Sequence, residues 1–245
     1  PAERFPAPDG DRGPDVAVIG AGLTGLTAGL LLRRAGLSVI VLERQRVSRA
    51  ATAHTSAHLT AVPDAPLRTL VARFGESGAQ EVVRACREAL DTVETLCKEL
   101  AADAGFVRVP AFRWSERAGD RDELRDEALA AARLGLHATL VDSTPLPFEV
   151  AAAIRFDDQA LVQPLRYTAR LARAFVEEGG SLYEETPVES VEAEGDDRAR
   201  LEAAGHVVHA RAVVHATQTP VGRVLSVQTR LAPVTSYVCV ARLAS

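Results

Sequence analysis

The stretch DVAVIGAGLTGLTAGLLLRRAGLSVIVLER, residues 15–44, decides which fold this chain adopts. It carries no charge from Val16 to Leu32, and two arginines follow at once, as they would beside a membrane-spanning helix. The uncharged run is at the lower limit of what a helix needs to cross ~30 Å of hydrocarbon. Its four glycines would also weaken a single continuous helix. Both features argue against a membrane span.

The same stretch divides naturally into a strand, a helix and a second strand. Residues 16–19 form a short apolar run typical of a strand buried on both faces. Leucines then recur at helical spacing from Leu23 to Leu32, and Gly36 is placed to end the helix. Residues 38–42 form a second buried strand. The order predicts a βαβ unit.

Three glycines fall between the first strand and the helix, in the pattern Gly20-x-Gly22-x-x-Gly25. In a dinucleotide site they permit a tight turn, close approach of the pyrophosphate, and close packing of helix on strand. The phosphates would lie at the helix N-terminus, where N–H groups point outward. Glu43 ends the second strand, near the ~20-residue offset at which an acid binds a ribose hydroxyl. The pattern predicts dinucleotide binding; the alternative is a simple packing contact between helix and sheet.

The overall composition is that of an ordinary soluble globular protein, with 47% apolar and 25% charged residues. A length of 245 residues suits one large domain or two modest ones. The net charge of −5 gives no reason to expect nucleic acid or an anionic membrane as a partner. Three cysteines without a CxxC motif favour a reducing, cytoplasmic setting.

The rest of the chain shows further periodic segments. An apolar stripe runs through residues 76–102 and includes Cys86 and Cys97, which we therefore interpret as core residues. Residues 106–115 are expected to form a pair of strands with a turn at Pro110. Helices are predicted over residues 123–134 and 164–178, and strands over residues 181–184, 187–192, 200–203, 207–209, 212–216 and 234–243.

Three pieces of sequence, taken together, carry a family resemblance. They are GAGLTGL…AGLSVIVLER, the loop TAHTSAHLT, and DDQALVQPLRYTARLARAFVEEGGSLYEETPVESV…ARAVVHATQTP. As a set they resemble the FAD-dependent oxidoreductases of the D-amino-acid oxidase and glycine oxidase superfamily. The nearest similarity is to a bacterial branch in which the flavoprotein half precedes a Rieske domain. The resemblance implies FAD as the cofactor.

The resemblance also implies which residues lie at FAD. The backbone of Val188 would contact adenine, and a returning strand would end beside the flavin at Ala216 and Thr217. Gln218 follows, where the family often has glycine. Arg44 could reach the adenosine, or it could simply be solvated. The full set comprises Gly20, Ala21, Gly22, Leu23, Thr24, Gly25, Glu43, Arg44, His54, Thr55, Ser56, Val188, Ala216 and Thr217.

His54 has three interpretations. Its loop resembles the segment in which dimethylglycine and sarcosine dehydrogenases attach a histidine to the flavin 8α-carbon. The other two interpretations are noncovalent lining of the cofactor site and an ordinary loop role. His54 and His58 are not a zinc pair of the HExxH type, because that motif needs a glutamate between its histidines and a third ligand. Thr55, Ser56 and Ala57 stand between them, and none is a glutamate. We expect no metal site, and we interpret His209 and His215 as structural.

The resemblance implies oxidation of a C–N bond in an amine or amino acid, with hydride transferred to flavin N5. Electrons would then pass to oxygen or to a carrier. No residue of the sequence stands out as a separate catalytic acid or base. Two alternatives remain at this point: an NAD(P)-dependent Rossmann dehydrogenase, and a truncated flavin-binding remnant without catalysis.

The predicted fold class is α/β, with a Rossmann-type FAD-binding domain and an inserted, partial antiparallel sheet that forms the substrate domain. We expect a disordered arm over residues 1–14. The FAD-binding domain should comprise residues 15–75 and 151–222, and the partial substrate domain residues 76–150 and 223–245.

The chain resembles only part of a full-length family member, so we expect it to lack a C-terminal portion. The strand predicted at residues 234–243 would then have an unpaired edge. Such an edge invites association, so a homo-oligomer is the expected consequence.

Overall fold

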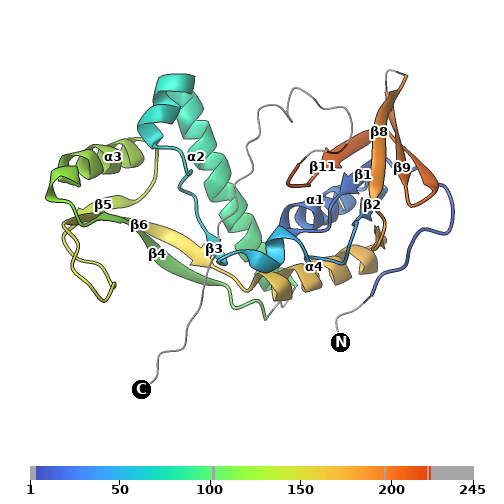
Figure 1. The fold of residues 1–245 in the computed structure, drawn as a ribbon, viewed down its shortest axis with the longest axis horizontal. Coiled ribbons are helices and arrows are strands. Elements are labelled where there is room, and N and C mark those ends of the chain that lie inside the picture. The colour runs from blue at the N-terminus through green and yellow to red at the C-terminus, as the bar shows by residue number, and fades with distance from the viewer. Residues whose placement is uncertain (1–3, 101–102, 196, 220, 222–245) are drawn as a thin grey trace. The chain divides into compact units, whose positions relative to one another are not determined.

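The computed structural model describes residues 4–100, 103–195, 197–219 and 221. These form two compact units, one with residues up to Arg49 and from Phe175 on, the other with residues 50–174 (Figure 1). This division differs from the expected domains. Residues 50–75 and 151–174, expected in the FAD-binding domain, belong to the second unit. The strand predicted at residues 234–243 lies outside the described residues.

The first unit contains the predicted βαβ arrangement. Strands β1 (Val16–Ile19) and β2 (Val39–Leu42) are parallel, and helix α1 (Leu23–Arg34) connects them. Every residue of both strands is buried, as expected for a sheet covered on both faces. Strands β7 (Ser181–Tyr183) and β11 (Ala212–His215) complete a parallel sheet of order β11-β1-β2-β7.

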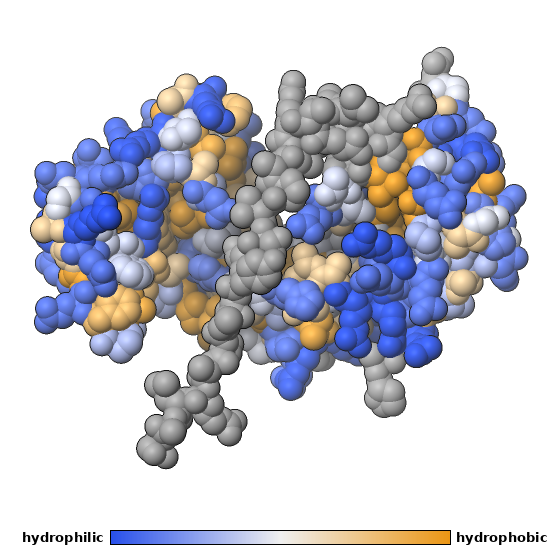
Figure 2. Space-filling view, in the orientation of Figure 1, coloured by the Kyte–Doolittle hydropathy of each residue, from blue (hydrophilic) through white to orange (hydrophobic). Residues whose placement is uncertain are grey.

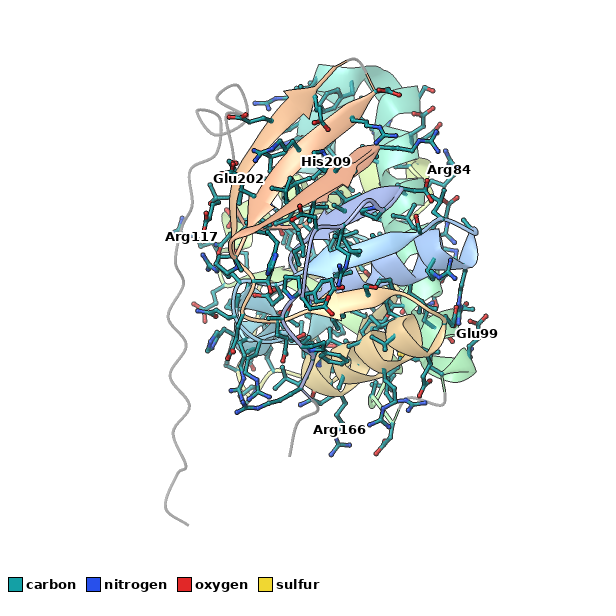
Figure 3. The ribbon with its side chains drawn as sticks, turned by 90° about the vertical axis from the view of Figure 1, so that its right-hand side faces the viewer. Arg84, Glu99, Arg117, Arg166, Glu202 and His209 are labelled. Atoms are coloured by element: carbon teal, nitrogen blue, oxygen red, sulfur yellow. The ribbon has the colours of Figure 1, made fainter. Side chains whose placement is uncertain are left out.

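An antiparallel sheet also belongs to the first unit. Its strands are β8 (Val188–Glu194), β9 (Arg198–Ala203) and β10 (His206–Ala210). Figure 3 labels Glu202 and His209 on this sheet. A hairpin turn at residues 204–205 joins β9 to β10. One apolar core joins the two sheets; it comprises Ala17, Ile19, Ile40, Leu42, Tyr183, Leu201, Ala203, Val208 and Ala210.

The segment before β1, expected to be disordered, makes specific contacts over its described residues. The Arg12 N–H donates to the Val207 carbonyl at 3.0 Å, and the His209 N–H donates to the Arg12 carbonyl at 2.9 Å. The Arg12 Nε also donates to the Tyr183 hydroxyl at 3.0 Å. The segment therefore pairs with β10, whose backbone groups form hydrogen bonds with those of Arg12. The composition of the segment does not reveal this pairing.

The second unit combines helices with an antiparallel sheet. Helix α2 spans Leu67–Glu99, but Gly75 has φ 71° and interrupts it, so the helix predicted from residue 76 corresponds to the part after the break. Helix α3 (Arg121–Arg133) agrees with its prediction. Helix α4 (Pro164–Glu177) does so too, and the boundary between the units falls within it. Short 3₁₀ turns occupy Ala51–His54 and Ala118–Asp120.

The sheet of the second unit has β6 (Ala152–Leu161) at its centre. Strands β3 (His58–Leu59), β4 (Val107–Ser115) and β5 (Ala138–Val141) all pair with it in antiparallel fashion. The core between this sheet and helices α2 and α3 includes Val83, Leu90, Leu124, Ala131, Ile154 and Phe156. Cys97 is buried and Cys86 packs against the core, which confirms that both are core residues.

The strand pair predicted over residues 106–115 is wrong, because β4 is a single strand. Pro110 has no N–H to donate, and the register shifts between Val109 and Ala111. Over this interval the partner strand β6 has one residue more than β4, since Val109 pairs with Gln159 and Ala111 pairs with Phe156. A β-bulge thus absorbs the interruption that the sequence suggests is a turn.

The face of the described residues that Figure 2 shows is mostly polar, with scattered apolar side chains. The rings of Trp114 and Phe148 contact each other edge to face at 5.2 Å and are both exposed. No helix in the described part of the chain is long and apolar enough to span a membrane.

Candidate functional site

The carboxyl ends of the parallel strands bring the predicted site residues of the first unit together. The glycine turn follows β1, Glu43 follows β2, and Ala216 follows β11. Because parallel strands end at the same edge of a sheet, these residues share that edge, where α/β proteins bind ligands. The Gly20 N–H donates to the Leu42 carbonyl at 2.8 Å, and the Ala216 N–H donates to the Ile19 carbonyl at 3.0 Å.

Two glycines of the motif are required by close packing. Gly20 has φ 105°, a left-handed conformation that side chains disfavour, and a Cβ there would lie 2.8 Å from the Ala216 carbonyl oxygen. A Cβ on Gly25 would lie 1.9 Å from the Gly20 carbonyl oxygen and 3.2 Å from the Ala216 Cβ. The turn, the start of α1 and the end of β11 are therefore in direct contact. Packing alone accounts for these two glycines.

Gly22 differs from the other two glycines because its backbone conformation does not require glycine. It is the N-cap residue of α1, with φ −85° and ψ −171°, which other residues also adopt. Having no side chain, it cannot occupy the position in front of the helix N-terminus, and the first turn of α1 contains no acidic residue. This arrangement fits a pyrophosphate, which the helix dipole would favour there.

Glu43 is a buried carboxylate, 7% exposed, beside the glycine turn. Its Oε2 accepts a hydrogen bond from the Ala21 N–H at 2.8 Å, and its Oε1 accepts one from the Gln45 N–H at 2.9 Å. Each carboxylate oxygen can accept a second hydrogen bond, so both contacts leave capacity for a ribose hydroxyl. The side chain thus fits the expected dinucleotide while it also ties β2 to the turn.

The other predicted residues of the first unit surround this edge. Arg44 is exposed beyond the end of β2. Ala216 contacts the turn as described above, and the Thr217 Cγ2 would lie 3.7 Å from a Cβ on Gly20. Val188 begins β8, pairs with Ala203 and packs partly buried against the core. Leu23 and Thr24 form the first turn of α1.

The predicted loop residues lie in the other unit. His54 ends a 3₁₀ turn and is exposed, as are Thr55 and Ser56. His58 belongs to β3, so the two histidines do not share a helix. Among the described residues no group of three or more His, Cys, Asp or Glu side chains could hold a metal ion. The three interpretations of His54 all stay predictions.

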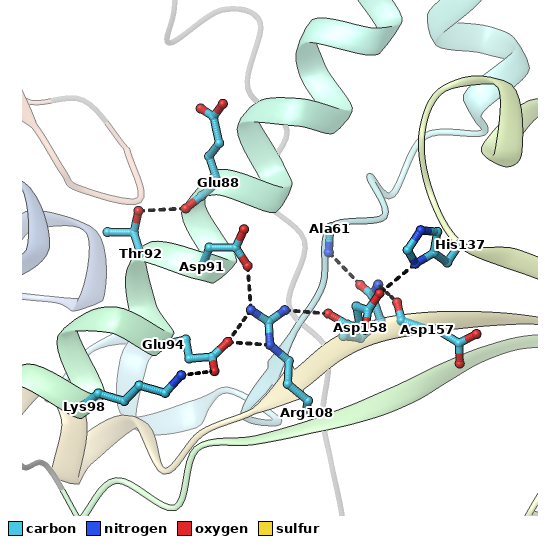
Figure 4. Close-up of polar contacts among 11 residues, drawn as sticks. Ala61, Glu88, Asp91, Thr92, Glu94, Lys98, Arg108, His137, Asp157 and Asp158 are labelled. Carbon is cyan, nitrogen blue, oxygen red and sulfur yellow. Dashed lines mark hydrogen bonds and ion pairs between the residues drawn. The ribbon is translucent and has the colours of Figure 1, made fainter.

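Figure 4 shows a polar network in the second unit. Part of this network, including Arg108 and His137, lines a cavity of 290 Å³. Arg108 is at the centre of the network and contacts the Asp91 carboxylate at 2.6 Å, the Glu94 carboxylate at 2.5 Å and the Asp158 carbonyl at 2.7 Å. His137 pairs with the Asp158 carboxylate at 2.8 Å. These groups satisfy one another, so we interpret the network as structural.

Two residues near the glycine turn were not predicted from the sequence. Ser48 is buried, and its N–H donates to the Ala21 carbonyl at 3.1 Å. Glu184 is also buried and follows β7 directly, just as Glu43 follows β2. That placement after a buried strand was a usable signal for Glu184, whereas nothing in the sequence marks Ser48.

Comparison with known proteins identifies the family of this chain. Residues 15–245 match the family described as FAD dependent oxidoreductase. The Bacillus subtilis protein YhfW, whose name describes a Rieske 2Fe-2S iron-sulfur protein, is 27% identical over 216 residues. That match covers 88% of this chain and 42% of YhfW. OrdL of Haemophilus influenzae, named as an oxidoreductase, is 28% identical over 181 residues, covering 71% of this chain and 42% of OrdL.

Solved structures share the fold. Glycine oxidase from Geobacillus kaustophilus superposes with a TM-score of 0.65 at 23% identity, covering 84% of this chain and 55% of that one. L-proline dehydrogenase from P. horikoshii gives a TM-score of 0.70 at 18% identity, covering 84% and 53%. The chain therefore spans about half the length of the proteins that it matches. These similarities confirm the predicted fold class, with its Rossmann-type FAD-binding fold.

Proposed function

We propose that this chain, which belongs to the family of FAD dependent oxidoreductases, forms the FAD-binding part of an enzyme that oxidises a C–N bond of an amine or amino acid. The observation that carries the proposal is the glycine turn before α1, with the buried Glu43 carboxylate bonded to the Ala21 N–H at 2.8 Å. Packing contacts account for Gly20 and Gly25, whereas the backbone conformation at the N-cap of α1 does not itself require the glycine found there. The family supports FAD over NAD(P) as the dinucleotide.

The residues of the first unit would bind and orient the cofactor. Gly22, which has no side chain, would let the pyrophosphate approach the N-terminus of α1. Glu43 would accept a hydrogen bond from a ribose hydroxyl, and Arg44 would lie beside the adenosine. Val188 would offer its backbone to adenine, while Ala216 and Thr217 would lie beside the isoalloxazine. When bound, FAD supplies a two-electron acceptor that takes hydride at N5.

The substrate class is proposed from the relatives' names. Glycine oxidase and L-proline dehydrogenase are both named for an amino acid, and the chain shares their fold. Because it spans about half of their length, the substrate, the electron acceptor and catalysis by this chain are all part of the proposal. We assign no catalytic acid or base among the described residues. The cytoplasmic setting and self-association also stay predictions.

Titration with FAD and with NAD⁺ tests the cofactor. We expect the purified protein to bind FAD with a flavin absorption band, and to bind NAD⁺ weakly. Binding of NAD⁺ without binding of FAD would instead support the dehydrogenase alternative.

A substrate panel tests the reaction. Amines and amino acids should bleach the flavin band anaerobically. Reoxidation by oxygen, with release of peroxide, or only by an artificial electron acceptor then distinguishes an oxidase from a dehydrogenase. A protein that binds FAD but is bleached by no member of the panel would support the non-catalytic alternative.

A further inference from the structure

A second buried carboxylate lies beside Glu43 at the carboxyl edge of the parallel sheet. Leu42 and Tyr183 are paired in register across β2 and β7, so Glu43 and Glu184 directly follow paired residues. Glu184 is 4% exposed. Burying a carboxylate is costly unless hydrogen bonds compensate for the lost water, so the partners of Glu184 indicate what it does.

Glu184 binds backbone on the neighbouring loop. Its Oε1 accepts a hydrogen bond from the Val47 N–H at 2.7 Å. Its Oε2 accepts one from the Phe5 N–H at 3.2 Å and lies 3.9 Å from the Arg46 Nε. The shortest contact is therefore to the loop that follows β2.

That loop, residues 44–48, is held on two sides. On one side the Glu185 N–H donates to the Gln45 carbonyl at 2.7 Å, next to the Glu184 contact. On the other side the Ser48 N–H donates to the Ala21 carbonyl in the glycine turn at 3.1 Å. The loop thus connects the end of β7 to the predicted pyrophosphate site.

Backbone strain is found at both of these contacts. Ser48 has φ 60° and Glu185 has φ 54°, left-handed values that are uncommon for residues other than glycine. Such conformations persist only where the surrounding contacts over-determine them. The contacts of Glu184, Glu185 and Ser48 together supply that constraint.

We propose that Glu184 is a positioning residue for the cofactor site. By accepting the Val47 N–H it fixes the 44–48 loop, so that Glu43 and Arg44 meet the adenosine half of the dinucleotide in one geometry. Glu184 acts through the loop and does not itself touch the cofactor. This inference rests on the proposed FAD site.

Titration calorimetry with ADP, the adenosine and pyrophosphate half of FAD, tests the role. Wild-type protein should bind both FAD and ADP; if it binds neither, the proposed function fails before Glu184 is tested. In Glu184→Ala we expect ADP affinity to fall about tenfold or more, because the Val47 N–H loses its acceptor. In Glu184→Gln an amide oxygen can still accept from Val47, so we expect ADP affinity within about threefold of wild type.

Asp15→Ala is the matched control. The Asp15 carboxylate accepts the Ser38 N–H at 2.8 Å, tying β1 to the start of β2 at the opposite edge of the sheet. The Asp15→Ala variant should have lower stability and an unchanged ADP affinity.

Hydrogen exchange adds a measurement without ligand: the Val47 amide should exchange faster in Glu184→Ala and keep its protection in Asp15→Ala. Wild-type ADP affinity or unchanged Val47 protection in Glu184→Ala overturns the proposal, and so does an equal loss of ADP affinity in Asp15→Ala.

Discussion

The Glu43 Oε2 accepts a hydrogen bond from the Ala21 N–H at 2.8 Å, so a side chain at the end of β2 holds the turn that follows β1. The contact is buried, since Ala21 is 0% exposed and Glu43 is 7% exposed. Because water is excluded from this position, the charge-assisted hydrogen bond is stronger than it would be at the surface. It links the residue expected at the ribose to the turn expected at the pyrophosphate.

Replacing Glu43 should affect stability and cofactor binding together. Glu43→Ala leaves the Ala21 and Gln45 N–H groups without their acceptor, which should lower the free energy of unfolding by about 1–3 kcal/mol. FAD affinity should fall at least about tenfold, because a ribose contact is lost as well. Urea denaturation and FAD titration measure the two effects. Glu192→Ala, at an exposed position, is the control; FAD affinity unchanged in Glu43→Ala would remove Glu43 from the site.

Gly25→Ala tests the packing of α1 on the turn. The new Cβ would lie 1.9 Å from the Gly20 carbonyl oxygen, so the helix must shift away from β1. We expect the free energy of unfolding to fall by about 3 kcal/mol, and FAD binding to be lost as a consequence. Gly119→Ala provides the control, since a Cβ there meets nothing within 4 Å. Equal melting temperatures for Gly25→Ala and wild type would show that this packing is misjudged.

Gly22→Val should separate binding from folding. The backbone of Gly22 has φ −85°, which valine can adopt, so the free energy of unfolding should fall by only about 1 kcal/mol, the cost of valine at an N-cap. The branched side chain would nevertheless block approach of a pyrophosphate to the helix N-terminus. We expect a folded protein that no longer binds FAD, measured by circular dichroism and flavin absorbance. Undiminished FAD affinity would count against the pyrophosphate site.

His54 decides whether FAD is attached covalently. If the histidine is bonded to the flavin, acid precipitation should leave yellow colour in the pellet, and His54→Ala should release it. If His54 only lines the site, the flavin should stay in the supernatant while the variant binds FAD more weakly. A variant that matches wild type in both measurements would support an ordinary loop role. His58→Ala, four residues further along the chain in β3, is the matched control.

Glu94 should make the second unit sensitive to acid. Its hydrogen bonds to Lys98 and then Arg108 hold the pKa of the carboxyl below its ordinary value of 4.5. The stabilisation is therefore complete above that value and is lost as pH falls through the lowered pKa. Near neutral pH, Glu94→Gln should reduce the free energy of unfolding by about 1 kcal/mol, and the difference from wild type should vanish in acid. Urea denaturation across pH, with Glu88→Gln as an exposed control, checks this; a constant difference at every pH would contradict it.

The sequence by itself determined the βαβ unit, the glycine turn and the acid at the end of β2. These features follow from local spacing, because strand and helix periodicity and the glycine positions all lie within about thirty consecutive residues. The hairpin between β9 and β10 and the helix beginning at Pro164 are equally local. The family resemblance also depends on short motifs, spread over three pieces of the sequence.

Only the tertiary structure decided which distant residues share the site. Ala216 contacts Gly20 although the whole second unit lies between them in sequence, and Glu184 binds Val47 across a similar separation. Local periodicity contains no information about such pairs, since they depend on which strands become neighbours in the sheet. The same reason explains Pro110, where pairing with β6 produced a bulge in place of a turn. The glycine motif thus predicts where the site lies, while the pairing of distant strands determines which other side chains lie beside it.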